Sequence, residues 1–453
     1  MKKLILKQLK IEYKISYIFS IVLFSLAALT CYYMDLQTLT IWTVNVWDTI
    51  YETGNPFNYY AYSAQNLHGL SHAMVGSDLL IYLPWAIWNL PIWILQRFFD
   101  LNILDHPLML FYSKCFLILL LGFCCILFKK IACLLTDNKE DIAKNILLYS
   151  SSFFVLTGVA YIGQNDILVI LTMLLALYNL LKKNTVKFVL WSALSIAFKP
   201  FFIFSYIALI LFKEKKLIRV ILYALAGMSF YFIQKVPFLF APMYTESLSY
   251  GPTSNVLGLL LTATFPISPV GISIFVFSLL VAYVMAYLDN ADSNEKGKII
   301  YYCILPFICF FAFTFYESYR PVYLFTLFYL LMLVKPMYRR INLWLETVST
   351  GCLIVYYMVS DLLFYNGNYI YLPFTNNTSI TMNQFFSEHL PNPGLNAFMA
   401  LFTFCLIFMA VINHPNFKSQ NPVLLMKEER YLIPVRSFLF AIPFIFAILL
   451  KCI

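Results

Sequence analysis

Residues 35–78 read DLQTLTIWTVNVWDTIYETGNPFNYYAYSAQNLHGLSHAMVGSD and separate the first apolar run of the chain from the next. The stretch is rich in aromatic residues and has no lysine or arginine. Elsewhere the chain alternates apolar runs with short, lysine-rich turns, so we interpret this segment as a functional surface. Its acids and histidines are Asp35, Asp48, Glu52, His68, His72 and Asp78.

The composition of the chain is that of a membrane protein. Of its 453 residues, 61% are hydrophobic, 19% are aromatic and only 12% are charged, whereas soluble domains are roughly half apolar and about one quarter charged. The net charge of +9 lies in short clusters between the apolar runs, where lysine and arginine set membrane orientation, so nucleic acid is not an expected partner. We predict an all-α integral membrane protein that forms one polytopic domain over residues 1–453.

The first apolar run argues against a signal peptide, and the cysteines argue against disulfides and a metal site. Residues 15–34 are long enough to span a bilayer and have no small-residue cleavage site, so we expect a retained helix and not a signal peptide. The ten cysteines lie almost entirely in or beside apolar runs and have no metal-binding spacing. They are therefore interpreted as buried thiols, and we expect neither disulfides, a metal site nor a cofactor.

Lysines before the first span place the N-terminus in the cytoplasm and residues 35–78 outside. Residues 36–51 have apolar side chains at helical spacing, which predicts an amphipathic helix on the outer surface with Asp35 as its N-cap. Pro84 and Pro91 interrupt the next apolar run, so we expect 79–107 to form broken, partly re-entrant helices at the outer interface.

Clusters of basic residues then mark the cytoplasmic ends of the remaining spans. The first such cluster is Lys129-Lys130. Residues 188–212 begin and end beside lysines, so they are expected to form a hairpin of two short helices with Lys199-Pro200 at its centre. This makes about thirteen transmembrane helices, with the C-terminus outside and longer loops on the outer face. The other predicted spans are 15–34, 108–128, 144–162, 166–181, 217–234, 268–288, 299–315, 321–334, 343–364, 395–413 and 437–450.

Ionisable residues at the outer ends of these spans are candidates for function, because a charge without a partner is costly in the bilayer. Three cations at this level would suit a lipid phosphate or pyrophosphate, with carboxylates beside them for chemistry. All of the candidates except Lys199 have a plainer alternative: the GQND sequence at 163–166 can be a polar turn, Lys114 can extend to the interface, and Glu317 can pair locally with Arg320. The candidates are Lys114, Lys199, Arg320, Asn165, Asp166 and Glu317.

The acids of the first outer loop suggest a second kind of chemistry. Asp35 lies at the end of the first span beneath aromatic residues, and sugar transfer needs a general base with flat side chains that stack on sugars. The alternative is that Asp35 only caps a helix and that Asp48 faces water. His68 and His72 have a spacing that suits a metal, but no third ligand is predictable, so we expect hydrogen-bonding or solvated histidines.

The order of these motifs resembles the GT-C superfamily of polytopic glycosyltransferases, which take sugars from polyprenyl-phosphate donors outside the membrane. The chain is similar to the bacterial mannosyl- and arabinosyl-transferring members and, more remotely, to protein O-mannosyltransferases. The likeness covers most of residues 1–335, although Lys114 stands where an arginine is more usual and Tyr316 where a histidine is. The matching motifs are Asp35, IYLPWAIWNLP at 81–91, FYSKCFLILLLG around Lys114, GQND at 163–166, LSIAFKPFFIF at 194–204 and YESYRPVY at 316–323.

The resemblance implies an inverting, metal-independent glycosyltransferase in the cell membrane, with its active site on the outer face. It would move a hexose or pentose from a polyprenyl-phosphate donor to a lipid-linked or cell-envelope glycan. Asp35 would be the base, favoured by position over Asp48. By the same resemblance, Lys114, Lys199 and Arg320 would bind the donor phosphate, and His72, Asn165, Asp166 and Glu317 would bind the sugar.

Two other functions fit an outward-facing polytopic protein. A transporter or flippase of lipid-linked saccharides would need two inverted halves with broken helices at the midplane, which an odd number of spans fits poorly. A glycan polymerase would use a lipid-pyrophosphate donor and arginine-rich outer loops, whereas Arg320 is the main arginine predicted there.

Overall fold

The computed structural model describes residues 11–67, 75–102, 106–250, 263–267, 270–290, 294–314, 320–360, 392–417 and 429–452. These residues are overwhelmingly helical, which confirms the all-α part of the expected fold class. In the described part of the chain, strands occur only in an antiparallel pair, β1 (Thr264–Ile267) and β2 (Val270–Ser273), with Thr264 opposite Ser273.

The helices follow the apolar runs. The first half of the chain contains α2 (Ile11–Thr30), α3 (Met34–Thr53), η1 (Pro56–Asn58), α4 (Tyr59–Gln65), η2 (Leu79–Ile81), α5 (Leu83–Trp88), α6 (Leu90–Phe99), α7 (Pro107–Leu135), α8 (Lys139–Ser150), α9 (Phe153–Val155), the π-helix η4 (Leu156–Ile162), α10 (Asp166–Leu181), α11 (Thr185–Phe198) and α12 (Phe202–Lys213). The second half contains α13 (Leu217–Ile233), η5 (Val236–Phe238), α14 (Tyr244–Tyr250), α16 (Ile274–Leu288), α17 (Glu295–Phe313), α18 (Val322–Val334), η6 (Pro336–Tyr338), α19 (Arg339–Ser360), α21 (Asn392–Ile412) and α22 (Glu429–Cys452).

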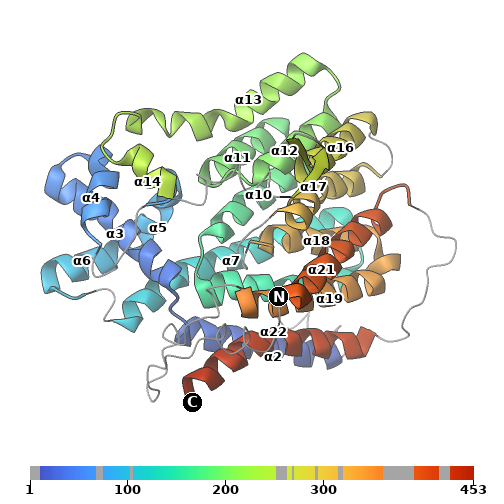
Figure 1. Ribbon diagram of the computed structural model, residues 1–453, viewed down its shortest axis with the longest axis horizontal. Helices are drawn as coiled ribbons and strands as arrows, with labels where there is room; N and C mark the ends of the chain where they lie inside the picture. The colour runs from blue at the N-terminus through green and yellow to red at the C-terminus, as the bar shows by residue number, and fades with distance from the viewer. Residues whose placement is uncertain are drawn as a thin grey trace.

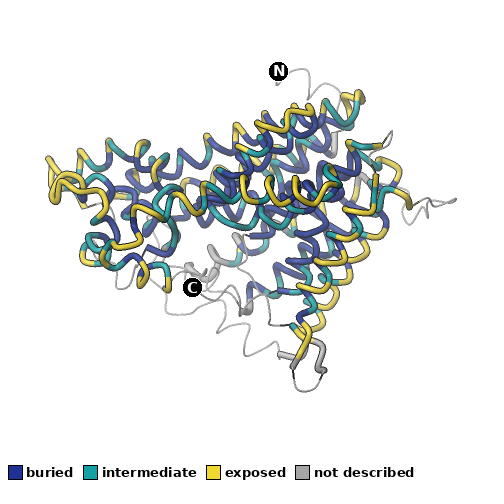
Figure 2. The backbone as a smooth tube through the Cα atoms, turned by 90° about the horizontal axis from the view of Figure 1, so that it is seen from above, coloured by how far each residue is buried: buried dark blue, intermediate teal, exposed yellow. Residues whose placement is uncertain are grey.

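The bundle has a buried centre and two lateral edges. Helices α2 and α22 lie side by side along one edge, and α13 runs along the opposite edge (Figure 1). Buried residues fill the middle of the bundle, and exposed ones lie on its periphery (Figure 2). Helices α3 to α6 and α14 form a lobe at one end of the molecule, at the left of Figure 1.

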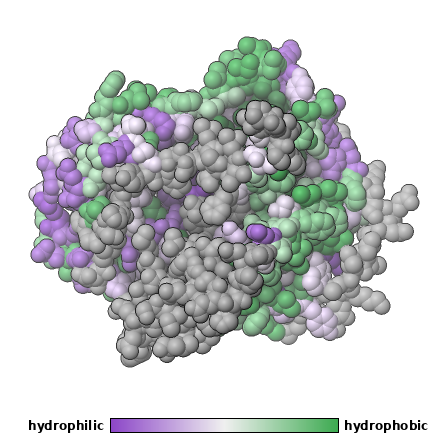
Figure 3. All heavy atoms as spheres, in the orientation of Figure 1, coloured by the Kyte–Doolittle hydropathy of each residue, from purple (hydrophilic) through white to green (hydrophobic). Residues whose placement is uncertain are grey.

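Several helices have the length and composition to cross a membrane. Within the described residues there are five such helices, or up to eight if each bent pair counts as one span. Only 11% of the apolar window in Leu217–Phe238, which comprises α13 and η5, is buried, and the outer face of α13 presents apolar side chains such as Leu222, Leu225 and Phe232 (green at the top of Figure 3). A large exposed apolar face of this kind is typical of a surface that meets lipid. The predicted number of about thirteen spans stays a prediction.

Two predicted interruptions are confirmed, and a third, within the predicted span 144–162, was not expected. Pro84 and Pro91 lie in the first turns of α5 and α6, where the missing N–H of proline costs nothing, and the two helical segments are bent by 69°. The segment 188–212 is divided into α11 and α12 at Lys199, as expected. The segment 144–162 is also broken, with a bend of 44° between α8 and the helical stretch that follows Ser152.

Three local predictions differ from the structure. Helix α3 begins one residue before Asp35, with Tyr33 as its N-cap, so Asp35 lies in the first helical turn, where an acid is favoured by the helix dipole. Helix α3 does not lie on the surface, because α4, α5, α6 and α7 cover it and most of its residues from Leu36 to Thr49 are buried. The expected inner turn at Lys129-Lys130 is likewise helical, since α7 continues through the apolar residues that follow.

The predicted inner turns gather at one end of the bundle, which we call the lysine end. There Lys213, the last residue of α12, binds Glu295 at the start of α17, and Lys298 lies 2.6 Å from Asp289, which follows α16. Lys335, after α18, donates to the carbonyl of Phe417, after α21, at 3.1 Å. These contacts bring several of the predicted inner turns together, whereas the alternation of all the spans and the side of the membrane that this end faces stay predictions.

One fully buried ion pair joins the later helices to α8. The guanidinium of Arg436 in α22 donates to both carboxylate oxygens of Glu346 in α19, each at 2.9 Å. It also donates to Ser151 at 2.9 Å and to the hydroxyl of Tyr329 in α18 at 2.8 Å. The side chains of Arg436 and Glu346 are 0% and 1% exposed, so each charge depends on the other for compensation.

We predict that Glu346→Gln lowers the free energy of unfolding by about 3–5 kcal/mol, because it leaves the buried Arg436 charge without a counter-ion. The measurement is thermal or denaturant unfolding of the purified protein in detergent. Glu52→Gln is the control, because Glu52 pairs with Arg97 on the surface, where both side chains are more than one third exposed. Equal stability of the two variants would contradict the assigned role of the buried pair.

Candidate functional site

A buried lysine holds the ends of two helices together at the end of the bundle opposite the lysine end. Lys114, in α7, is completely buried. Its ammonium donates to the carbonyls of Cys31 and Ala28 at the C-terminal end of α2 and to that of Ala160 in η4, the last at 2.8 Å. An ammonium has three N–H donors, and carbonyls at a helix C-terminus attract a cation. Lys114 therefore fixes the end of α2 against η4.

The loop after η4 depends on a glycine. Gly163 has φ +77°, in the left-handed region, and a Cβ added there would lie 3.0 Å from Leu36 of α3. Glycine is favoured on both counts, because it adopts positive φ without strain and lets the two backbones approach closely. The π-helical turn that precedes it is of a kind that occurs often at functional sites. This close approach places residues 163–166 directly beside the start of α3.

The loop contacts Asp35 through Gln164. The side-chain amide of Gln164 donates to a carboxylate oxygen of Asp35. Asp35 is half-buried, whereas Gln164 is 8% exposed. The buried amide thus holds a carboxylate that remains partly accessible from outside the bundle.

The same loop holds a cation on its other side. Asp166, the first residue of α10, lies 2.8 Å from the ammonium of Lys199 and accepts a hydrogen bond from the hydroxyl of Tyr323 in α18. The Asp166 side chain is 3% exposed and the Lys199 side chain 15%. Lys199 follows α11, so a single carboxylate joins the ends of the consecutive helices α10 and α11 to the start of the distant helix α18.

Arg320 completes the cluster. Its guanidinium lies 5.0 Å from the ring centroid of Phe201, which follows Lys199 by two residues. The Phe201 ring is in turn 5.7 Å from that of Tyr323. Arg320 therefore lies on the same side of the bundle as Lys199 and Tyr323, next to the loop 163–166. We call Asp35, Gln164, Asn165, Asp166, Lys199, Arg320 and Tyr323 the polar cluster.

Asp48 lies elsewhere. It is 4% exposed and accepts a hydrogen bond of 2.8 Å from the indole of Trp93 in α6. Because a helix rises about 1.5 Å per residue, Asp48 is roughly 20 Å from Asp35 along α3. It therefore neither faces water nor joins the polar cluster, and the prediction that it competes with Asp35 is not supported. His72 and Glu317, also predicted to bind substrate, lie outside the described residues, as does His68.

Lys114 also differs from its predicted role. Its three carbonyl contacts and complete burial leave it inside the scaffold, so it positions the site and does not present a charge to a donor phosphate. Conversely, sequence reasoning gave no role to Gln164 or Tyr323. Gln164 lies within the motif GQND and Tyr323 within YESYRPVY, so these motifs were the features of the sequence that could have indicated the two residues.

A further ion pair lies between the lobe and the end of α13. Asp78 is 2.8 Å from Lys235 and accepts a hydrogen bond of 2.8 Å from the hydroxyl of Tyr244. Burial, together with the hydrogen bond to Asp78, raises the pKa of Tyr244 above its usual range. The neighbouring Gln234 donates to the carbonyl of Ala197 near Lys199 at 2.8 Å. Asp78 thus connects the lobe to the neighbourhood of the polar cluster.

The polar cluster combines groups of complementary chemistry. It offers one partly exposed carboxylate, two cations and the amide of Asn165, which is 3% exposed. The Oδ1 atom of Asn165 has no hydrogen-bond partner among the described residues. A buried acceptor without a partner costs about 1–3 kcal/mol, so such an atom is suited to receive a hydroxyl from a ligand. Comparisons with protein families, with curated proteins and with solved structures found no match.

We predict that Gly163→Ala destabilises the protein more than Gly54→Ala. Both glycines have positive φ, so alanine costs about 1–2 kcal/mol at each. Only at Gly163 would the added Cβ press on Leu36, whereas nothing lies within 4 Å of a Cβ at Gly54. Overpacking adds about 1–3 kcal/mol at the first position. Unfolding in detergent measures the difference, and equal losses would show that the contact between Gly163 and Leu36 is not tight.

Proposed function

We propose that the protein is an inverting glycosyltransferase of the cell membrane. It moves a hexose or pentose from a polyprenyl-phosphate donor to a lipid-linked or cell-envelope glycan on the outer face, with the N-terminus in the cytoplasm. One observation carries the proposal: the loop 163–166 holds the partly exposed Asp35 carboxylate through Gln164 and the Lys199 ammonium through Asp166. A base for the acceptor and a cation for the leaving phosphate are thus fixed relative to each other.

Asp35 acts as the general base. The acceptor hydroxyl oxygen attacks the anomeric carbon as the bond from that carbon to the phosphate oxygen breaks, and the hydroxyl proton passes to the Asp35 carboxylate. The hydrogen bond from Gln164 orients this carboxylate. A positioned base of this kind contributes about 10²–10⁴-fold to the rate.

Lys199 and Arg320 stabilise the leaving phosphate. Negative charge grows on the phosphate as the glycosidic bond breaks, so nearby cations lower the energy of the transition state more than that of the ground state. One N–H of Lys199 points to Asp166, and an ammonium has two further donors for phosphate oxygens. Asp166 keeps the cation in place and is a positioning residue in this mechanism. Lys114 positions the end of α2 that precedes Asp35.

The sugar pocket includes Asn165, whose buried Oδ1 is suited to accept a hydrogen bond from a sugar hydroxyl. The resemblance to glycosyltransferases adds Glu317 and His72 to this pocket. The aromatic residues of the lobe supply flat surfaces of the kind that pack against sugar rings.

We predict that Asp35→Asn reduces transfer by about 10²–10⁴-fold. Asparagine keeps an oxygen that accepts from Gln164 but cannot take up the acceptor proton, so folding is expected to be unchanged. The assay follows labelled sugar from a panel of polyprenyl-phosphate hexoses and pentoses into glycan acceptors. Asp48→Asn is the matched control, since Asp48 lies roughly 20 Å away on the same helix.

Two outcomes would contradict the proposal. Full activity of Asp35→Asn would exclude Asp35 as the base. Movement of labelled lipid-linked saccharide across the membrane without any covalent product would favour a flippase over an enzyme.

A further inference from the structure

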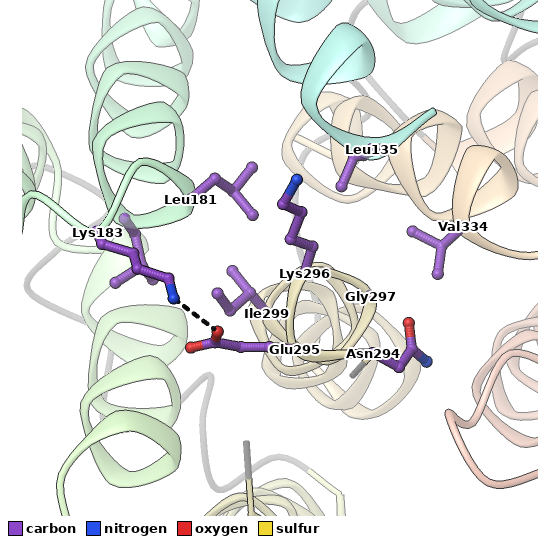
Figure 4. A pocket seen from close by; sticks show the side chains of 10 residues that line it. Leu135, Leu181, Lys183, Asn294, Glu295, Lys296, Gly297, Ile299 and Val334 are labelled. Atoms are coloured by element: carbon purple, nitrogen blue, oxygen red, sulfur yellow. Dashed lines mark ion pairs between the residues drawn. The ribbon is translucent and has the colours of Figure 1, made fainter. Parts of the chain in front are cut away.

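A cavity of about 340 Å³ lies at the lysine end, far from the polar cluster (Figure 4). It is enclosed by the C-terminal ends of α7, α10 and α18 and by the first turn of α17. Its volume is at the lower end of the range for small-molecule sites, which is about 300–1,000 Å³. The cavity is therefore large enough for the polar head of a ligand, but not for a complete lipid.

The charges around this cavity favour an anion. Lys183 and Lys296 line it together with Glu295. The Glu295 carboxylate is bound by Lys213 through one oxygen, and its other oxygen is 3.9 Å from the ammonium of Lys183 (Figure 4). Two ammonium groups thus approach the Glu295 carboxylate, and Lys296 adds a third cation to the wall of the cavity. The side chain of Lys183 is 79% exposed, so its contact with Glu295 is weak and can be exchanged for a ligand.

The fold also holds the ammonium of Lys296, the second lysine of the cavity, in place. Lys296 donates to the carbonyl of Leu134 at the end of α7 at 2.9 Å, which leaves its ammonium further N–H donors. Lys183 itself adopts φ +60°, a conformation unusual for a residue with a side chain. Backbone hydrogen bonds from Lys183 to Leu180 and from Asn184 to Asn179, both 2.9 Å, maintain this turn. The turn holds Lys183 opposite the first residues of α17.

The rest of the wall is apolar. Leu135, Leu181 and Val334 face the cavity beside the two lysines (Figure 4). Helices α7 and α17 have the length and composition to cross a membrane, so their ends at the cavity are suited to the level of the lipid headgroups. A soluble phosphate would contact the lysines but would gain nothing from the leucines and the valine. Basic pockets between transmembrane helices commonly bind the headgroups of anionic lipids.

We propose that this cavity binds the headgroup of an anionic phospholipid. Its phosphate diester contacts Lys183 and Lys296, and the glycerol and first acyl carbons pack on Leu135, Leu181 and Val334. The site is independent of the proposed transfer reaction, because it is built from the opposite ends of the helices.

The test is native mass spectrometry of the purified full chain titrated with phosphatidylglycerol or with phosphatidylcholine of the same acyl chains. We expect one tightly bound phosphatidylglycerol. The double variant Lys183→Gln/Lys296→Gln should bind it about thirtyfold more weakly, at the roughly fivefold per lysine that attraction to anionic lipid provides. The matched control is Lys187→Gln/Lys216→Gln, which removes two exposed lysines that do not line the cavity. It should retain wild-type binding.

Lys183→Gln alone keeps the test decisive if the double variant folds poorly, because this exposed side chain supports no core contact. It should weaken binding about fivefold. Unchanged binding in Lys183→Gln, equal losses in the cavity and control variants, or equal affinity for the two lipids would overturn the proposal. Binding of glycerol phosphate as tight as that of the lipid would assign the cavity to a soluble phosphate and overturn the lipid assignment.

Discussion

The ammonium of Lys114 has to be surrounded by acceptors, because a charge among apolar helices is costly without them. The acceptors are backbone carbonyls from the end of α2 and from η4. This one requirement fixes the distance between the segment that leads to Asp35 and the segment that leads to the loop 163–166. The close approach of Leu36 to Gly163 follows from it, and so does the contact between Gln164 and Asp35.

The cost of burying a charge without a partner also determines where the other charges of the bundle lie. Many ionisable groups lie at one of its two ends, and the pair Arg436–Glu346 lies in the interior, where the two charges compensate each other. The lysine end holds its cations against carbonyls and against carboxylates such as Glu295 and Asp289. The opposite end keeps a carboxylate, a cation and an unsatisfied amide oxygen close together. The end with the proposed lipid site and the end with the proposed reactive site are thereby separated by the length of the helices.

Much of this arrangement could be predicted from the sequence. The apolar runs locate the helices, the prolines locate the break between α5 and α6, and Lys199-Pro200 marks the division between α11 and α12. The convergence of Asp166, Lys199 and Arg320 also follows from helices that alternate in direction. The partners of Lys114 could not be predicted, because they are backbone carbonyls and every residue has one. Asp48 was misjudged because the helical pattern of 36–51 does not reveal that later helices cover that helix.

The central claim is that the polar cluster faces outward while the lysine end faces the cytoplasm. The most direct test is cysteine labelling in intact cells with a membrane-impermeant maleimide, in a background where the exposed Cys133 is replaced by serine. Gln65 and Lys187 are both exposed, the first in the lobe and the second at the lysine end. We predict that Gln65→Cys is labelled in intact cells and Lys187→Cys only after permeabilisation. Labelling of Lys187→Cys but not Gln65→Cys in intact cells would contradict it.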